Sequence, residues 1–93
     1  MAVNVRVPGA LRTETGGAST VDVELPGGTL GQVLDLLRQE YPRLERRLRD
    51  EQGELRRYVN VYVDGEECRR LDGLATEVPD GAEIFVVPSV AGG

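Results

Sequence analysis

The chain has 93 residues and a net charge of -5, and 40% of its residues are hydrophobic and 29% are charged. This length suits a single domain, and the charge argues against nucleic acid as the main partner because phosphate binding requires concentrated Lys or Arg. No stretch approaches the roughly 20 apolar residues of a membrane span and the N-terminus alternates like a strand rather than a signal peptide, so we expect a cytoplasmic protein without a membrane partner.

The first part of the chain predicts two strands. Apolar and polar residues alternate over residues 3–7 and again over residues 21–25, which is the period of a strand with one buried face. Pro8-Gly9 ends the first strand, and a polar loop that contains Gly16-Gly17 is expected to follow it.

A helix is predicted after the second strand. Thr29 and Gln32 have the spacing of a capping box, and the helix should end at Tyr41 because Pro42 disfavours helical backbone at the residue before it. One stripe of this helix is apolar, at Leu30, Val33, Leu34 and Leu37. A short second helical segment is expected over residues 43–49.

Three more strands are predicted in the second half. They cover residues 58–63, 66–71 and 82–87, and Asp64-Gly65 joins the first two as a two-residue type I′ hairpin turn. The element order predicts an α+β domain of the β-grasp type, with a mixed sheet of about five strands packed on one main helix. The N- and C-terminal strands are expected side by side at the centre of the sheet.

Composition limits the chemistry that this chain can perform alone. Histidine is absent and Cys68 is the only cysteine, which removes cysteine-based zinc sites, iron–sulfur ligation and nucleophile–histidine pairs. We expect Cys68 to be a half-buried strand residue whose pKa is raised by the adjacent carboxylates. A non-enzyme with no bound metal or cofactor is therefore expected.

All basic residues are arginine, and six of the eleven lie between Arg43 and Arg57. Acidic residues are interleaved with them, so a solvated face is expected there, with a docking patch for an acidic partner surface as the alternative. Because lysine is absent, the chain offers no side-chain amine as an acceptor for its own activated carboxyl group.

A candidate docking face follows from strand alternation. If the valines of the 58–63 strand point toward the helix, the residues between them point to the opposite face of the sheet. The candidate face consists of Tyr58, Asn60, Tyr62, Phe85 and Val87. An exposed apolar patch ringed by charge is typical of a docking site; loops that cover it and a dimer contact are the alternatives.

The chain ends in Pro88-Ser89-Val90-Ala91-Gly92-Gly93. We expect residues 1–88 to form the domain and residues 89–93 to form a flexible C-terminal arm. Five residues reach at most about 17 Å, and two terminal glycines let the arm enter a narrow channel. Its carboxylate is a poor electrophile that another protein must activate, most simply as an acyl-adenylate made from ATP.

The chain resembles the ubiquitin-like sulfur carriers of the MoaD/ThiS type, the family that contains the thiamin sulfur carrier and the small subunit of molybdopterin synthase. The likeness spans residues 2–93 and is greatest to the CysO-type carriers of cysteine biosynthesis. It is carried by residues 57–66, Gly73-Leu74-Ala75-Thr76, Pro79-Asp80-Gly81 and Val90-Ala91-Gly92-Gly93.

The resemblance implies a function for the arm. Gly93 would be adenylated by an E1-like enzyme and converted to a thiocarboxylate, while Val90, Ala91 and Gly92 lie in the partner's channel. For a CysO-type carrier, the acceptor would be an activated serine bound by a pyridoxal-phosphate enzyme, and a protease would release the cysteine. The resemblance also implies that carriers of this type can supply sulfur for thiamin, molybdopterin or sulfur-containing natural products.

Two alternatives remain open. One is a protein modifier whose Gly93 forms amide links to lysines of other proteins. The other is a molybdopterin synthase small subunit, whose arm is lodged permanently in a larger partner.

Overall fold

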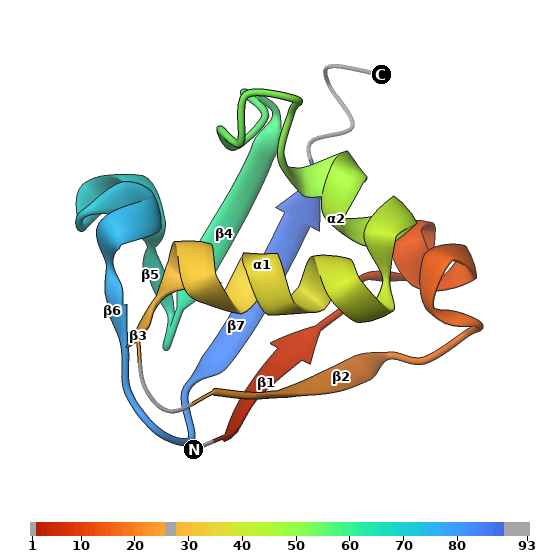
Figure 1. Cartoon of the computed structure of the whole chain (residues 1–93), viewed down its shortest axis with the longest axis horizontal. Coiled ribbons are helices and arrows are strands. Elements are labelled where there is room, and N and C mark those ends of the chain that lie inside the picture. The colour runs from red at the N-terminus through yellow and green to blue at the C-terminus, as the bar shows by residue number, and fades with distance from the viewer. Residues whose placement is uncertain (1, 26–27, 89–93) are drawn as a thin grey trace.

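The computed structural model describes residues 2–25 and 28–88, and Figure 1 shows a mixed sheet packed against two α-helices. The strands are β1 (Ala2–Arg6), β2 (Thr20–Glu24), β3 (Gly28–Thr29), β4 (Val59–Val63), β5 (Glu66–Glu67), β6 (Glu77–Val78) and β7 (Glu83–Pro88). The helices are α1 (Leu30–Glu40), α2 (Pro42–Leu48) and the 3-10 helices η1 (Gly9–Thr15), η2 (Cys68–Arg70) and η3 (Gly73–Ala75). None of the helices in the described ranges is long and apolar enough to cross a membrane.

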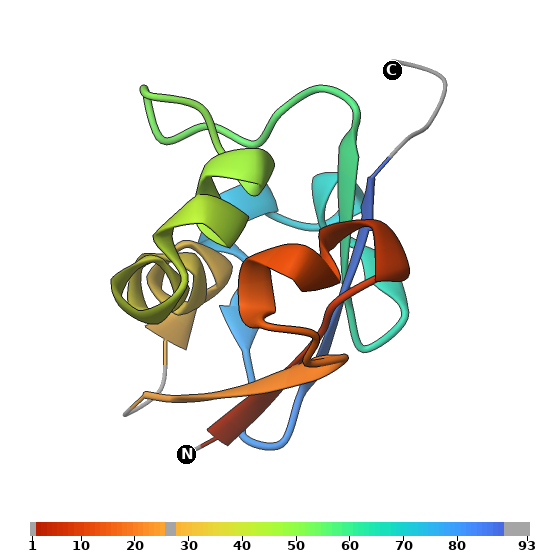
Figure 2. The ribbon, with the colours of Figure 1, turned by 90° about the vertical axis from the view of Figure 1, so that its right-hand side faces the viewer.

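The main sheet has five strands in the order β2-β1-β7-β4-β5. β1 and β7 run parallel, and the other neighbouring pairs are antiparallel. The first and last strands are therefore adjacent, and β7 occupies the middle of the sheet, as predicted. With α1 and α2 on one side of the sheet (Figure 2), this confirms the β-grasp architecture. A second sheet, formed by β3 and β6, was not predicted.

Helix α1 begins and ends as its sequence predicts. The Thr29 N–H donates to Gln32 Oε1 at 2.9 Å and the Gln32 N–H donates to Thr29 Oγ1 at 3.3 Å, which completes the capping box. Pro42 then occupies the first turn of α2, where its missing N–H costs no helical hydrogen bond. The two helices thus meet at Tyr41 and pack as one layer.

One hydrophobic core lies between this layer and the sheet. Alternate residues of β1, β2, β4 and β7 are buried, and α2 contributes Leu44 and Leu48 in addition to the predicted stripe of α1. The largest fully buried side chains include Leu30, Leu34, Leu37, Leu44, Leu48 and Ile84. Burial of each of these side chains stabilises the folded chain by roughly 1.5–3 kcal/mol of transfer free energy. Ile84 belongs to β7, so the core anchors this strand.

The Asp64-Gly65 turn confirms the predicted hairpin. Both residues have positive φ, 49° and 88°, as a type I′ turn requires. The Asp64 carboxylate accepts a hydrogen bond from the Glu83 N–H at 2.9 Å. This contact ties the hairpin to the start of β7.

The strand predicted over residues 66–71 is too long. β5 ends at Glu67, whose carboxylate accepts a hydrogen bond from the Arg69 N–H and starts η2. Because β5 is an edge strand, only one neighbour holds its backbone extended. The prediction of a half-buried strand position for Cys68 is therefore wrong: Cys68 lies in η2 and is completely buried.

The polar loop expected after the first strand is mostly the helix η1. Its Leu11 and Thr15 side chains are buried, and Thr15 Oγ1 lies 3.1 Å from the Arg12 carbonyl oxygen and 2.8 Å from that of Ala18. These contacts satisfy the buried hydroxyl. The sequence did not reveal η1 because one leucine in a polar segment produces no periodic pattern.

Candidate functional site

The middle strand of the sheet leads to the C-terminal arm. Pro88, the last residue of β7, is the Cα partner of Val59 in β4, and β7 also pairs with β1 on its other side. We call Pro88, Val59 and the adjacent Tyr58 the arm base. The predicted arm positions Val90, Ala91, Gly92 and Gly93 lie outside the described residues.

Four side chains of the candidate docking face, Asn60, Tyr62, Phe85 and Val87, alternate with the buried residues of β4 and β7 and lie on the sheet face opposite the helices, whereas Tyr58 lies in the turn before β4. Tyr58, Phe85 and Val87 are 46%, 43% and 38% exposed, and Asn60 and Tyr62 are partly buried. Tyr62 is the cross-strand partner of Phe85 and Asn60 is that of Val87, so these side chains are direct neighbours. We call the five residues together the outer patch; Tyr58 belongs both to it and to the arm base.

Polar and charged side chains border the outer patch. Arg6 is the β1 neighbour of Phe85, and its Nε lies 3.0 Å from Glu83 Oε2. Beyond them, Asn4 Nδ2 donates to Asp22 Oδ1 at 3.0 Å. An apolar centre with a polar rim is the general composition of a protein–protein interface.

Arg69 fastens the beginning of β4, a role that sequence reasoning missed. Its guanidinium donates to the carbonyl oxygens of Val59 and Arg56 at 2.8 and 2.9 Å, and to Asn60 Oδ1 at 3.2 Å. These bonds cross between η2 and the arm base. Backbone carbonyls are present at every position, so the sequence contains no signal for which carbonyls an arginine will bind.

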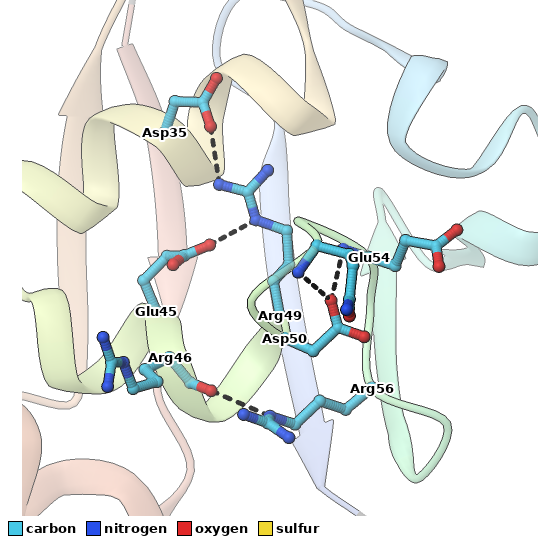
Figure 3. A network of polar contacts seen from close by, with 8 residues as sticks. Asp35, Glu45, Arg46, Arg49, Asp50, Glu54 and Arg56 are labelled. Carbon is cyan, nitrogen blue, oxygen red and sulfur yellow. Dashed lines mark hydrogen bonds and ion pairs between the residues drawn. The ribbon is translucent and has the colours of Figure 1, made fainter.

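Arg49 lies at the centre of a polar cluster on the helical side (Figure 3). Its Nη2 lies 2.7 Å from Asp35 Oδ1 on α1, and its Nε pairs with Glu45 one turn earlier on the chain. Burial alone would lower the pKa of Arg49, but the hydrogen bonds to Asp35 and Glu45 raise it overall. The solvated face expected over residues 43–57 is thus wrong for Glu45 and Arg49, which are only 5% and 8% exposed.

Cys68 is an inert thiol in this fold. Burial raises its pKa, and the neighbouring Glu67 carboxylate raises it further. The direction of the predicted shift is confirmed, although burial contributes more than the carboxylate. A thiol that stays protonated inside the core is a poor nucleophile.

Within residues 2–25 and 28–88, no group of three or more His, Cys, Asp or Glu side chains could hold a metal ion. The features of the described residues that suit a function are the outer patch and the arm base. An apolar patch that ends where a terminal arm begins can bind a partner and direct the arm into it.

Comparison with known proteins identifies the family. The family model described as "ThiS family" matches residues 5–93. The chain belongs to the ThiS family. It is 42% identical to the sulfur carrier protein CysO of Mycobacterium tuberculosis over the full length of both chains. It is also 48% identical to small archaeal modifier protein 3 of Haloferax volcanii over 65 residues, 70% of each chain.

A solved structure agrees with this assignment. A chain of the BexX/CysO complex of Amycolatopsis orientalis superposes with a TM-score of 0.84 at 40% identity, covering 98% of this chain and 99% of that one. The predicted ubiquitin-like fold, and the likeness to the CysO type within this ThiS-family chain, are therefore confirmed.

Proposed function

We propose that this chain is a sulfur carrier that bears sulfur as a thiocarboxylate on Gly93. The observation that carries the proposal is the family match, which includes the Gly-Gly end of the chain at residues 92 and 93. The relatives named as sulfur carriers align over the whole chain. The protein would act as a co-substrate of its partner enzymes and would not be a catalyst itself.

The proposed chemistry has two steps. An E1-like adenylating enzyme joins an oxygen of the Gly93 carboxylate to the α-phosphorus of ATP, and pyrophosphate leaves. A sulfur donor then attacks the acyl carbon of this mixed anhydride, AMP leaves, and the thiocarboxylate remains. ATP belongs to the activating enzyme in this scheme, and no cofactor is bound by the carrier.

The fold supports this role through the position of the arm base. The arm follows a strand that is paired with β4 as far as Pro88 and with β1 over residues 83–85, so a partner that binds the outer patch also fixes where the arm starts. The five arm residues reach at most about 17 Å from Pro88. Val90, Ala91 and Gly92 would occupy the partner's channel, and glycine at the last two positions leaves room around the reacting carbonyl.

For the acceptor, we propose an activated serine such as O-phosphoserine, bound by a pyridoxal-phosphate enzyme. The full-length likeness to CysO supports this choice, and a metalloprotease would then release the cysteine formed on Gly93. The BexX/CysO complex shows that a relative of this chain also associates with a protein called BexX. A sulfur-containing natural product, which the family resemblance also implies, is the second candidate destination of the sulfur.

A protein modifier is the rival function from another class. The likeness to small archaeal modifier protein 3 favours it, and the chemistry would start with the same adenylate. The two functions separate at the second step, because a modifier ends in an amide with a lysine of another protein and a carrier ends in a small-molecule product.

Reconstitution tests the proposal. The full chain is incubated with the E1-like enzyme of the same genome, ATP and a sulfide source, and a thiol-alkylating reagent is added under native conditions. We expect one alkylated product with the reagent on Gly93, because the only cysteine is buried. The Cys68→Ala variant should give the same product, and deletion of Gly93 should abolish it without changing the fold. A thiocarboxylate formed equally well without Gly93 would refute the proposal.

A further inference from the structure

A second surface feature lies beside the arm base. A recess there is lined by the arginines Arg56, Arg57 and Arg69, together with Tyr58 and the loop residues Asp50 and Glu54. Tyr58 is also counted in the outer patch, so the recess and the patch share this residue. Arg57 and Tyr58 immediately precede Val59, the partner of Pro88, which places the recess next to the start of the arm.

The guanidinium groups in the recess differ in how firmly they are held. Arg69 is fixed by its bonds to Val59 and Arg56, and Arg56 Nε donates to the Arg46 carbonyl oxygen at 2.9 Å (Figure 3). Arg57 is exposed and makes no side-chain hydrogen bond or ion pair with another described residue. Ordered arginines around one free arginine form a geometry that suits a carboxylate.

The two acidic residues that line the recess belong to the loop before β4. Asp50 Oδ1 accepts hydrogen bonds from the N–H groups of Gln52 and Glu54, at 2.9 and 3.0 Å, so it is committed to its own loop (Figure 3). Glu54 is exposed. Arg69 is paired with Glu67 Oε1 at 3.2 Å, whereas Arg57 has no such partner among the described residues, so Arg57 is the cation of the recess that can bind a further carboxylate.

The N-terminal end of β7, far from the arm, is surrounded by acidic residues. Asp64 accepts a hydrogen bond from the Glu83 N–H, and Asp80 Oδ1 accepts one from the Ala2 N–H at 3.0 Å. Glu66 follows in the same hairpin. A six-residue strand spans roughly 16 Å between these ends, so the charges are separated along the direction in which β7 leads into the arm.

We infer that the recess receives an acidic side chain of the enzyme that takes up the arm, at the entrance of that enzyme's channel. The inference rests on the proposed function. The length of the arm indicates that this occupant is a carboxylate of the partner protein. Gly93 reacts up to about 17 Å from Pro88, whereas the recess lies beside Pro88 and so contacts the protein surface around the channel entrance. The phosphates of a nucleotide that reacts with Gly93 would lie too far along the channel.

The separation of charge along β7 should also orient the chain as it approaches its partner. A partner with negative charge around its channel attracts the arginine end of β7 and repels the acidic end, so encounters begin with the arm toward the channel. Such steering raises association rates by ten-fold or more at low salt and fades as salt screens it.

The experiment compares two charge reversals in the full chain. Arg57→Glu alters the recess, and Arg43→Glu is the matched control because Arg43 is exposed on α2 and does not line the recess. Association rates with the E1-like enzyme are measured over a range of salt concentrations, next to ATP-dependent activation of the unchanged chain. We expect Arg57→Glu to slow association about ten-fold at low salt, to lose most of this difference at high salt, and Arg43→Glu to change the rate less than two-fold.

The outcomes are distinguishable. If the unchanged chain is activated but Arg57→Glu and Arg43→Glu associate equally fast, the inference is wrong and the proposed function stands. If the unchanged chain neither binds nor is activated, the proposed function fails and the inference fails with it. If inorganic phosphate at constant ionic strength removes the difference between the variants, the recess is a phosphate site and the assignment to a partner carboxylate is overturned.

Discussion

The two faces of β4 and β7 are made by the same alternating sequence, yet they differ in what they contact. Val61 and Ile84 point toward the helices and are completely buried, whereas the adjacent Phe85 is 43% exposed on the opposite face. On the helical face, a change of one side chain disturbs the packing of the whole domain. On the outer face, large apolar side chains contribute little to the core, which leaves them available for a partner.

The largest expected effect on stability concerns the buried ion pair between Arg49 and Glu45 in the helical layer. Arg49→Ala leaves Glu45 buried without its partner, so we expect a loss of about 3–5 kcal/mol in the free energy of unfolding, measured by urea denaturation. The matched control is Arg6→Ala, which removes the half-exposed Arg6–Glu83 pair on the other face and should cost about 1 kcal/mol or less. Equal losses in the two variants would mean that the faces do not differ as the structure indicates.

The next effect compares a buried and an exposed position of the same strand, β7. Ile84→Ala opens a cavity under the helices and should lower the free energy of unfolding by about 2–5 kcal/mol. Val87→Ala, which trims an exposed side chain of the same strand, should change it by about 0.5 kcal/mol or less. Comparable losses at both positions would show that the outer face is packed as well.

A smaller effect is expected at the start of α1. Thr29→Ala removes the side-chain acceptor of the capping box and should cost about 1 kcal/mol. Thr20→Ala is the control, because Thr20 is exposed on the edge strand β2. A Thr29→Ala variant as stable as Thr20→Ala would show that the cap contributes nothing to the helical layer.

The outer patch should show a small effect on stability and a large one on binding. We expect Phe85→Asp to change the free energy of unfolding by about 1 kcal/mol or less, and to weaken binding to the activating enzyme at least ten-fold, a size typical of a central interface residue. Calorimetric titration and thermal unfolding measure the two effects. If the variant unfolds easily while its folded fraction binds normally, Phe85 belongs to the core and our assignment of the face is wrong.

The smallest effect depends on pH. Because folding raises the pKa of Cys68 above its ordinary value of 9.0, the unfolded chain ionises first as the pH rises. The free energy of unfolding should therefore be unaffected by this group below about pH 9 and should decline above it. The decline should be weaker in Cys68→Ala, and identical pH profiles for the two proteins would contradict the raised pKa.

The sequence predicted the parts of the fold that depend on periodic or local patterns. The helix stripe, the Thr29 cap and the Asp64-Gly65 turn are encoded within a few residues. The missed features depend on partners distant in the chain: β6 exists because it pairs with β3, and Arg49 is buried because Asp35 on α1 lies opposite it.

In the candidate site, too, the sequence predicted the features that a local pattern encodes and missed those that depend on distant residues. Alternation alone placed Tyr62 and Phe85 on the face opposite the helices, and the register of β4 and β7 then made them neighbours. The recess was not predicted, since it joins Arg69 of η2 to the residues before β4. Only the folded chain brings these arginines together.

The intact mass of the protein isolated from its native host tests the central claim most directly. We expect a species heavier by the difference between sulfur and oxygen, which a thiol reagent alkylates at Gly93 under native conditions while the buried Cys68 remains unmodified. A protein found only as free carboxylate and as adducts linked through Gly93 to lysines of other proteins would contradict the sulfur-carrier function and establish the modifier function.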